Sequence, residues 1–132
     1  MTEANMLPVT AYTVAIMALV LTALSLNVSR LRLKHRVSFG HGEHKDLHMA
    51  VRAHGNALEQ TTLFALLLIT LEGLASSNGL LVPLATTFVI ARITHALALF
   101  ARQLRLRQLS HIVSVALQLV AAFAILARAL SS

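Results

Sequence analysis

The sequence contains no cysteine and no tryptophan, a single tyrosine, and only five acidic residues among 132. Without cysteine, the chain has no disulfide framework, no thiolate metal site and no cysteine nucleophile. A net charge of +6 is common in nucleic-acid-binding proteins. However, one tyrosine and no tryptophan leave almost nothing on which bases could stack. The basic residues therefore fit membrane orientation better than a nucleic-acid partner.

Apolar residues dominate the composition. They make up 57% of the chain, whereas charged residues make up 12%. In soluble domains, roughly 45–50% of the residues are apolar and about 25% are charged. A soluble fold of this length could not bury so much apolar surface, and a disordered chain would not contain it. The composition predicts an all-α integral membrane protein.

Four segments are predicted to cross the membrane and to form one four-helix bundle, a single domain over residues 1–132. They lie at about residues 6–29, 47–73, 80–101 and 109–130. The first is the clearest, because the 24 residues from Met6 to Ser29 carry no charge, enough to cross a hydrocarbon core of roughly 30 Å. No basic region precedes it, so we expect a retained helix rather than a signal peptide. A tight turn is expected at Ser76 to Gly79.

The second segment is the least apolar of the four. Its uncharged part, Gln60 to Leu71, has only 12 residues. It can span the membrane only if the polar residues before it lie inside the membrane or at its edge.

Basic residues are concentrated on one side of the predicted topology. The two loops on that side hold eight lysine and arginine residues, and the other side holds only Arg128. The positive-inside rule therefore predicts cytoplasmic loops and both termini on the non-cytoplasmic side. The eight residues are Arg30, Arg32, Lys34, Arg36, Lys45, Arg102, Arg105 and Arg107.

Two of the segments carry polar stripes. In RAHGNALE, Arg52, Asn56 and Glu59 share an arc of roughly 60° on a helix. By the same calculation, the third segment has a stripe made of Arg92, His95, Leu99 and Arg102. Polar groups at membrane depth are costly, so they usually mark function or tight pairing.

Two interpretations of these stripes remain open. In the first, Glu59 pairs with Arg92 and Asn56 bridges neighbouring groups, so that the polar residues only satisfy one another. In the second, the stripes line a pocket for a charged, peptide-like ligand. An arginine can clamp a carboxylate, an asparagine can match an amide, and a glutamate can hold an ammonium group. A small zwitterionic tripeptide presents that set of groups.

The spacing R-x3-N-x2-E at the start of a membrane helix resembles the signature of the MAPEG family, the membrane-associated proteins in eicosanoid and glutathione metabolism. ARITHALALFAR (residues 91–102) is similar to the family's third-helix pattern, and SRLRLKHR (residues 29–36) is similar to its basic stretch after the first helix. The resemblance covers nearly the whole chain and is closest to the small bacterial inner-membrane branch. It implies a bacterial inner-membrane protein.

The resemblance implies a homotrimer that binds glutathione, as a co-substrate, between neighbouring subunits. It also implies glutathione contacts from Arg30, Arg52, Asn56, Glu59 and His95, with Arg92 bracing Glu59. In catalytic members, an arginine near the start of the last helix lowers the pKa of the glutathione thiol, and the two candidates for this role are Arg105 and Arg107.

This chain departs from the family pattern at two places. The glutathione-using synthases have a tyrosine where this chain has Leu99. The proline that commonly follows the motif glutamate is replaced by the run Gln60, Thr61, Thr62.

Our first functional hypothesis is a glutathione-dependent transferase or peroxidase acting on hydrophobic electrophiles or lipid hydroperoxides. The alternative is a non-enzymatic accessory or lipid-binding membrane protein that retains the MAPEG scaffold, which Leu99 favours. Transport is a weaker alternative, because the charged residues cluster in one leaflet.

The segment HGEHKDLH contains three histidines at spacings that also occur in metal sites, namely His41, His44 and His48. We interpret it as a solvated loop and expect no metal.

Overall fold

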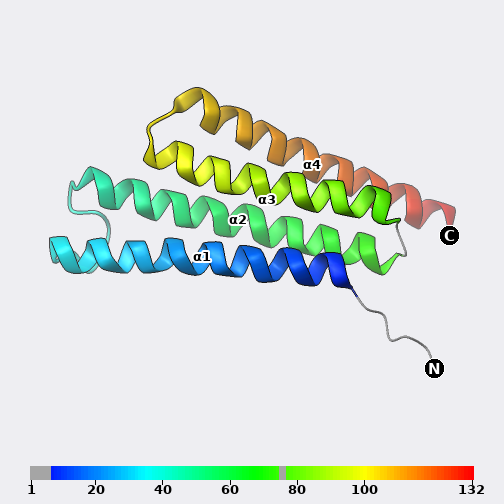
Figure 1. The fold of residues 1–132 in the computed structure, drawn as a ribbon, viewed down its shortest axis with the longest axis horizontal. Coiled ribbons are helices and arrows are strands. Elements are labelled where there is room, and N and C mark those ends of the chain that lie inside the picture. Colours follow the sequence, from blue (N-terminus) through cyan, green and yellow to red (C-terminus); the bar gives the residue numbers. More distant parts are fainter. Residues whose placement is uncertain (1–6, 75–76) are drawn as a thin grey trace.

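The computed structural model describes residues 7–74 and 77–132. These residues form four long helices, α1 (Pro8–His35), α2 (Lys45–Gly73), α3 (Asn78–Phe100) and α4 (Leu104–Ser131). They run side by side along the long axis of the molecule (Figure 1). The α1–α2 loop and the α3–α4 link lie at one end, and the start of α1 and the end of α4 lie at the other. The predicted all-α four-helix bundle is confirmed.

The helix ends differ from the predicted spans. Met6 lies outside the described residues, but α1 continues to His35, and α4 begins at Leu104 rather than near residue 109. Both extensions are rich in leucine and arginine, which are good helix formers, whereas hydropathy marks only the apolar part of a helix. At the expected tight turn, Ser76 lies outside the described residues. The prediction holds for Ser77, which precedes α3, but it is wrong for Asn78 and Gly79, which already belong to that helix.

Three of the helices, α1, α3 and α4, are long and apolar enough to cross a membrane. The remaining helix, α2, carries charged residues along much of its length, yet it contacts all three of the others. The described helices α1 and α4 do not contact each other. Their outer faces expose large apolar side chains, as expected for surfaces that meet lipid or another subunit. Examples are Tyr12, Leu19, Leu26, Ile112, Phe123 and Leu126.

The core differs between the two ends of the bundle. Toward the chain termini, large apolar side chains fill it, and Phe64 stacks on Phe88 with ring centroids 3.9 Å apart. Toward the loop end, the buried apolar residues include the small Ala53, Ala57 and Ala96. Small residues let helices approach closely and leave no bulk to fill the interior. Polar side chains therefore occupy the interior at the loop end.

A carboxylate from α2 caps the first turn of α1. The Glu72 carboxylate accepts hydrogen bonds from the backbone N–H groups of Val9 and Thr10, at 2.9 and 2.6 Å, and from the Thr10 hydroxyl at 2.6 Å. The residue before α1 supplies no side-chain cap of its own. A negative charge at a helix N-terminus satisfies free N–H groups and complements the helix dipole. Glu72 thus ties the start of α1 to the end of α2.

We expect the substitution Glu72→Gln to lower the free energy of unfolding by about 1–2 kcal/mol, because the cap loses its charge and one acceptor oxygen. Thermal unfolding in detergent, followed by circular dichroism, measures the loss. The amides of Val9 and Thr10 should also exchange hydrogen faster. Glu43→Gln, in the exposed α1–α2 loop, is the control. If both variants unfold at the same temperature with equal amide protection, the cap contributes no stability.

Candidate functional site

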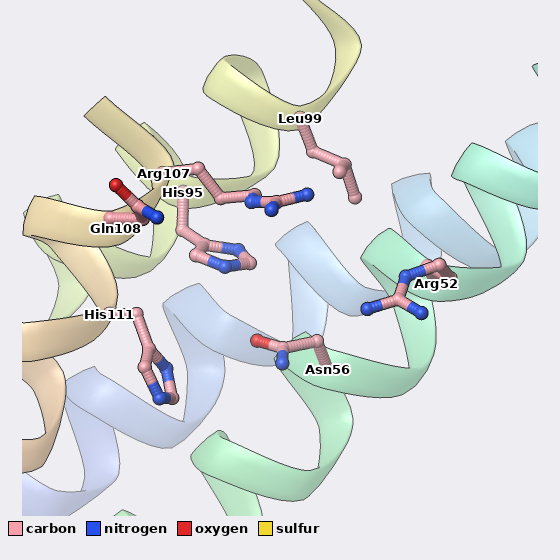
Figure 2. A pocket seen from close by; sticks show the side chains of 7 residues that line it. All are labelled: Arg52, Asn56, His95, Leu99, Arg107, Gln108 and His111. Atoms are coloured by element: carbon pink, nitrogen blue, oxygen red, sulfur yellow. The ribbon is translucent and has the colours of Figure 1, made fainter. Parts of the chain in front are cut away.

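A hollow of about 210 Å³ lies between α2, α3 and α4, toward the end of the bundle that carries the two basic connections. Figure 2 shows that Arg107 and His95 face Arg52 and Asn56 across the open space. Three helices therefore contribute to one site. The residues that line it are Arg52 and Asn56 from α2, His95 and Leu99 from α3, and Arg107, Gln108 and His111 from α4.

The lining is rich in hydrogen-bond donors. It contains two guanidinium groups, two imidazoles and two carboxamides, and no carboxylate comes from the described residues that surround the hollow. Guanidinium groups bind carboxylates strongly, often through two parallel hydrogen bonds. The hollow therefore suits a ligand that carries negative charge and peptide-like polar groups.

Behind the hollow, Arg92 holds the three helices together. Its side chain is only 1% exposed. The guanidinium donates to the Asn56 carboxamide oxygen on α2, to the Ser114 hydroxyl on α4 at 3.3 Å, and to His95 Nδ1 at 3.4 Å. Because a guanidinium can only donate, His95 Nδ1 accepts and the ring carries its proton on Nε2. His95 can therefore donate from Nε2.

The prediction that Glu59 pairs with Arg92 is wrong. Within the described residues Glu59 is exposed and forms no ion pair, and the carboxamide of Asn56 is the acceptor for Arg92. The two α2 residues are three positions apart, which turns their side chains by about 60°. That angle is enough to place Asn56 inside the bundle and Glu59 on the outer face of α2. Arg92 thus keeps a positive charge that no neighbouring carboxylate neutralises.

The other predicted site residues divide into two groups. Arg52, Asn56 and His95 meet at the hollow, as the spacing suggested. Arg30 lies outside it, exposed on α1, and donates to the Asn27 side chain at 2.8 Å. Of the two arginine candidates on α4, Arg107 lines the hollow, whereas Arg105 is exposed and does not.

Sequence reasoning missed two lining residues, Gln108 and His111. His111 faces the hollow, 6.3 Å from His95 between ring centroids. The signal was present, because His111 follows Arg107 by four residues and such residues share a helix face. It was overlooked because α4 was expected to begin after Arg107.

The polar interior ends at a pair of glutamines. The Gln118 side chain on α4 donates to the Gln60 side chain on α2 at 2.6 Å, which joins the two helices. Past this pair lie Phe64, Phe88 and the rest of the large apolar core. The hollow is thus closed toward the chain termini, which does not support a transport pathway.

The histidines of the α1–α2 loop pack against one another. His35 stacks on His44 at 3.8 Å and His41 meets His48 edge-on at 4.5 Å, both between ring centroids. His35 also pairs with Asp46 at 2.9 Å, and this hydrogen bond lowers the pKa of the Asp46 carboxyl. In residues 7–74 and 77–132, no three histidine or acidic side chains are grouped as a metal ion would need.

Comparison with known proteins finds a matching family and related bacterial membrane proteins. The sequence model of the MAPEG family matches residues 10–127. The inner membrane protein YecN of Escherichia coli K12 is 29% identical over 100 residues, which cover 76% of each chain. YecN of Escherichia coli O6:H1 matches with the same identity and coverage. No solved structure matches the chain significantly.

We expect Arg92→Leu to lower the free energy of unfolding by about 2–3 kcal/mol, because the polar groups of Asn56 and His95 lose their buried partner. Arg105→Leu is the control, since it removes the same charge from an exposed position on α4. Chemical unfolding in detergent micelles measures both variants. Equal stability of the two would show that the buried network is energetically neutral.

Proposed function

The chain belongs to the MAPEG family, and we propose that it is a glutathione-dependent transferase or peroxidase of the bacterial inner membrane. Its substrates are hydrophobic electrophiles or lipid hydroperoxides. The observation that carries the proposal is the meeting of Arg52, Asn56, His95 and Arg107 from three helices around one hollow. These are residue types that a carboxylate-bearing tripeptide with a thiol requires.

Each of these side chains has a separate role in the proposal. Arg52 clamps a glutathione carboxylate. The Asn56 carboxamide oxygen accepts a hydrogen bond from Arg92. Its NH₂ group is therefore left to donate to a peptide carbonyl. His95 donates from Nε2. Arg107 lies beside the thiol, where its positive charge favours the thiolate, the reactive form.

A single subunit offers an incomplete site, which supports the proposed homotrimer. The hollow of about 210 Å³ is smaller than the roughly 300 Å³ at which ligand pockets usually begin. Glu59, which would hold the glutathione ammonium group, is exposed at the middle of α2. An ionised group exposed to lipid is costly. A neighbouring subunit that covers Glu59 removes this cost, and its Arg30 then completes the site.

The chemistry starts from the thiolate in both proposed reactions. In a transfer, sulfur forms a bond to an electrophilic carbon and the leaving group departs with its electron pair. In a peroxidase reaction, sulfur attacks a hydroperoxide oxygen, the O–O bond breaks, and the alkoxide takes a proton from water. A second glutathione then converts the sulfenic acid to a disulfide and water.

The proposed topology follows from the positions of the basic residues. The α1–α2 loop, the α3–α4 link and the helix ends next to them hold eight of the arginines and lysines, and they lie at the same end of the bundle (Figure 1). With α2 as a fourth span, this end faces the cytoplasm and both termini lie on the other side. The hollow then opens toward the compartment that supplies glutathione.

We expect Arg52→Ala to weaken glutathione binding by at least about tenfold, because a charged hydrogen bond is lost. Glu59→Gln should weaken it as well, through lost contact with the ammonium group. Isothermal calorimetry on the purified protein in detergent measures the affinity. Arg128→Ala, at the exposed end of α4, should bind as the unsubstituted protein does. Unchanged binding in both site variants would refute the assignment.

We further expect glutathione bound to the protein to show the ultraviolet absorbance of a thiolate. Arg107→Ala should reduce this signal and Arg105→Ala should not, because Arg107 alone of the two lines the hollow. The two variants remove equal charge two residues apart on α4. No thiolate signal in the unsubstituted protein, together with no binding of glutathione, would favour the accessory, non-enzymatic role.

A further inference from the structure

A separate pocket of about 300 Å³ lies at the loop end of α1, where the chain leaves the helix and turns toward α2. This α1 pocket and the hollow between α2, α3 and α4 are lined by different residues. The residues that line the α1 pocket are Arg32, Leu33, Arg36, Val37 and Ser38.

Arg32 shapes the α1 pocket by holding the turn against the helix. Its Nη1 donates to the backbone carbonyl oxygens of Gly40, at 2.7 Å, and of Val37, at 3.4 Å. The chain can fold back here because Arg36 and Gly40 adopt positive φ angles of 56° and 66°. A guanidinium group carries N–H donors on all three of its nitrogens. The Nε and Nη2 donors of Arg32 are therefore left for an occupant of the pocket.

The lining of the α1 pocket carries two positive charges and no carboxylate. Arg36 follows Arg32 by four residues, so the two guanidinium groups share a face of α1. No ion pair within the described residues includes either of them, and Ser38 adds a hydroxyl. The C-terminal end of a helix contributes about half a negative charge, which two guanidinium groups outweigh. The α1 pocket therefore suits an anion with several acceptor oxygens, such as a phosphodiester.

The depth of the α1 pocket matches the headgroup layer of a membrane. Helix α1 is long and apolar enough to cross the membrane, and its uncharged run ends at Ser29. Arg32 comes three residues later, roughly 4.5 Å further along the helix axis. The headgroup layer on each side of the hydrocarbon core is about 5–7 Å thick. The guanidinium of Arg32 therefore lies at the level of the lipid phosphate groups.

An apolar line runs from the α1 pocket into the membrane-spanning part of the helix. Leu33 lines the pocket and is 81% exposed. Leu26 and Leu19 come seven and fourteen residues earlier, and they are 65% and 74% exposed. Positions seven apart differ by only about 20° around a helix, so the three leucines lie along one outer face. A soluble anion makes no use of this face, whereas the acyl chain of a lipid can lie along it.

We propose that the α1 pocket binds the phosphate group of an anionic phospholipid, whose acyl chain follows Leu26 and Leu19. Arg32, Arg36 and Ser38 hold the phosphate oxygens. A zwitterionic phospholipid would bring its own cation close to two guanidinium groups, so an anionic headgroup is favoured. The bound lipid ties the α1–α2 turn to the membrane surface. This proposal does not depend on glutathione or on the proposed enzyme activity.

The test is native mass spectrometry of the full-length protein in detergent, with dioleoyl phosphatidylglycerol as the anionic probe. We expect Arg36→Gln to weaken its binding by about tenfold, because a charged hydrogen bond is lost. The control is Lys34→Gln, which removes an equal charge from an exposed position. Lys34 lies about 200° from Arg32 around α1, so it is on the opposite side of the helix. Its substitution should change the affinity by less than about threefold.

Two further arms identify the ligand. Dioleoyl phosphatidylcholine, which is zwitterionic, should bind at least about tenfold more weakly than phosphatidylglycerol. An excess of inorganic phosphate should not displace the bound lipid, because phosphate makes no contact with the leucines.

Each opposite result overturns the proposal. Equal losses in Arg36→Gln and Lys34→Gln mean that the attraction is diffuse and that the α1 pocket is not a site. Equal affinity for the two lipids means that the pocket does not recognise the charge of the headgroup. Displacement by inorganic phosphate means that the occupant is a soluble anion rather than a lipid.

Discussion

The buried guanidinium of Arg92 is the constraint around which the loop end of the bundle is organised. A charge inside a membrane protein is tolerated only if its donors find acceptors. Here the acceptors are neutral and come from α2, α3 and α4. The three helices must therefore stay in one register to satisfy a single side chain. That register also sets the spacing of the residues that line the hollow in front of it.

Because these acceptors are neutral, the interior keeps a net positive charge. Arg92 lies behind the hollow, and Arg52 and Arg107 line it. An ion pair between Glu59 and Arg92 would have cancelled part of this positive charge and weakened the attraction of the hollow for an anionic ligand. Instead, Glu59 is left on the outer face of α2, free to meet a different group. The separation of the carboxylate from the buried arginine leaves the proposed site with the positive charge that an anionic ligand requires.

Much of the architecture follows from the sequence, because long apolar runs and basic connections are strong local signals. The meeting of Arg52, Asn56 and His95 also followed, since helical spacing places them on matching faces. The partner of Arg92 could not be predicted from the sequence. Asn56 and Glu59 differ by only about 60° around α2, and this small angle decides which of the two side chains lies inside the bundle. The choice of Arg107 over Arg105 depended on where α4 begins, and hydropathy does not detect a basic first turn.

The apolar half of the bundle has an electrical consequence. The stacked rings of Phe64 and Phe88 and the leucines around them close the interior past the glutamine pair. In the proposed orientation the hollow opens to one aqueous side and shares its voltage, so most of the membrane potential would drop across this closed half. An anion entering the hollow then moves little charge through the electric field. In the proposed function, binding of an anionic ligand in the hollow would therefore depend little on the membrane potential.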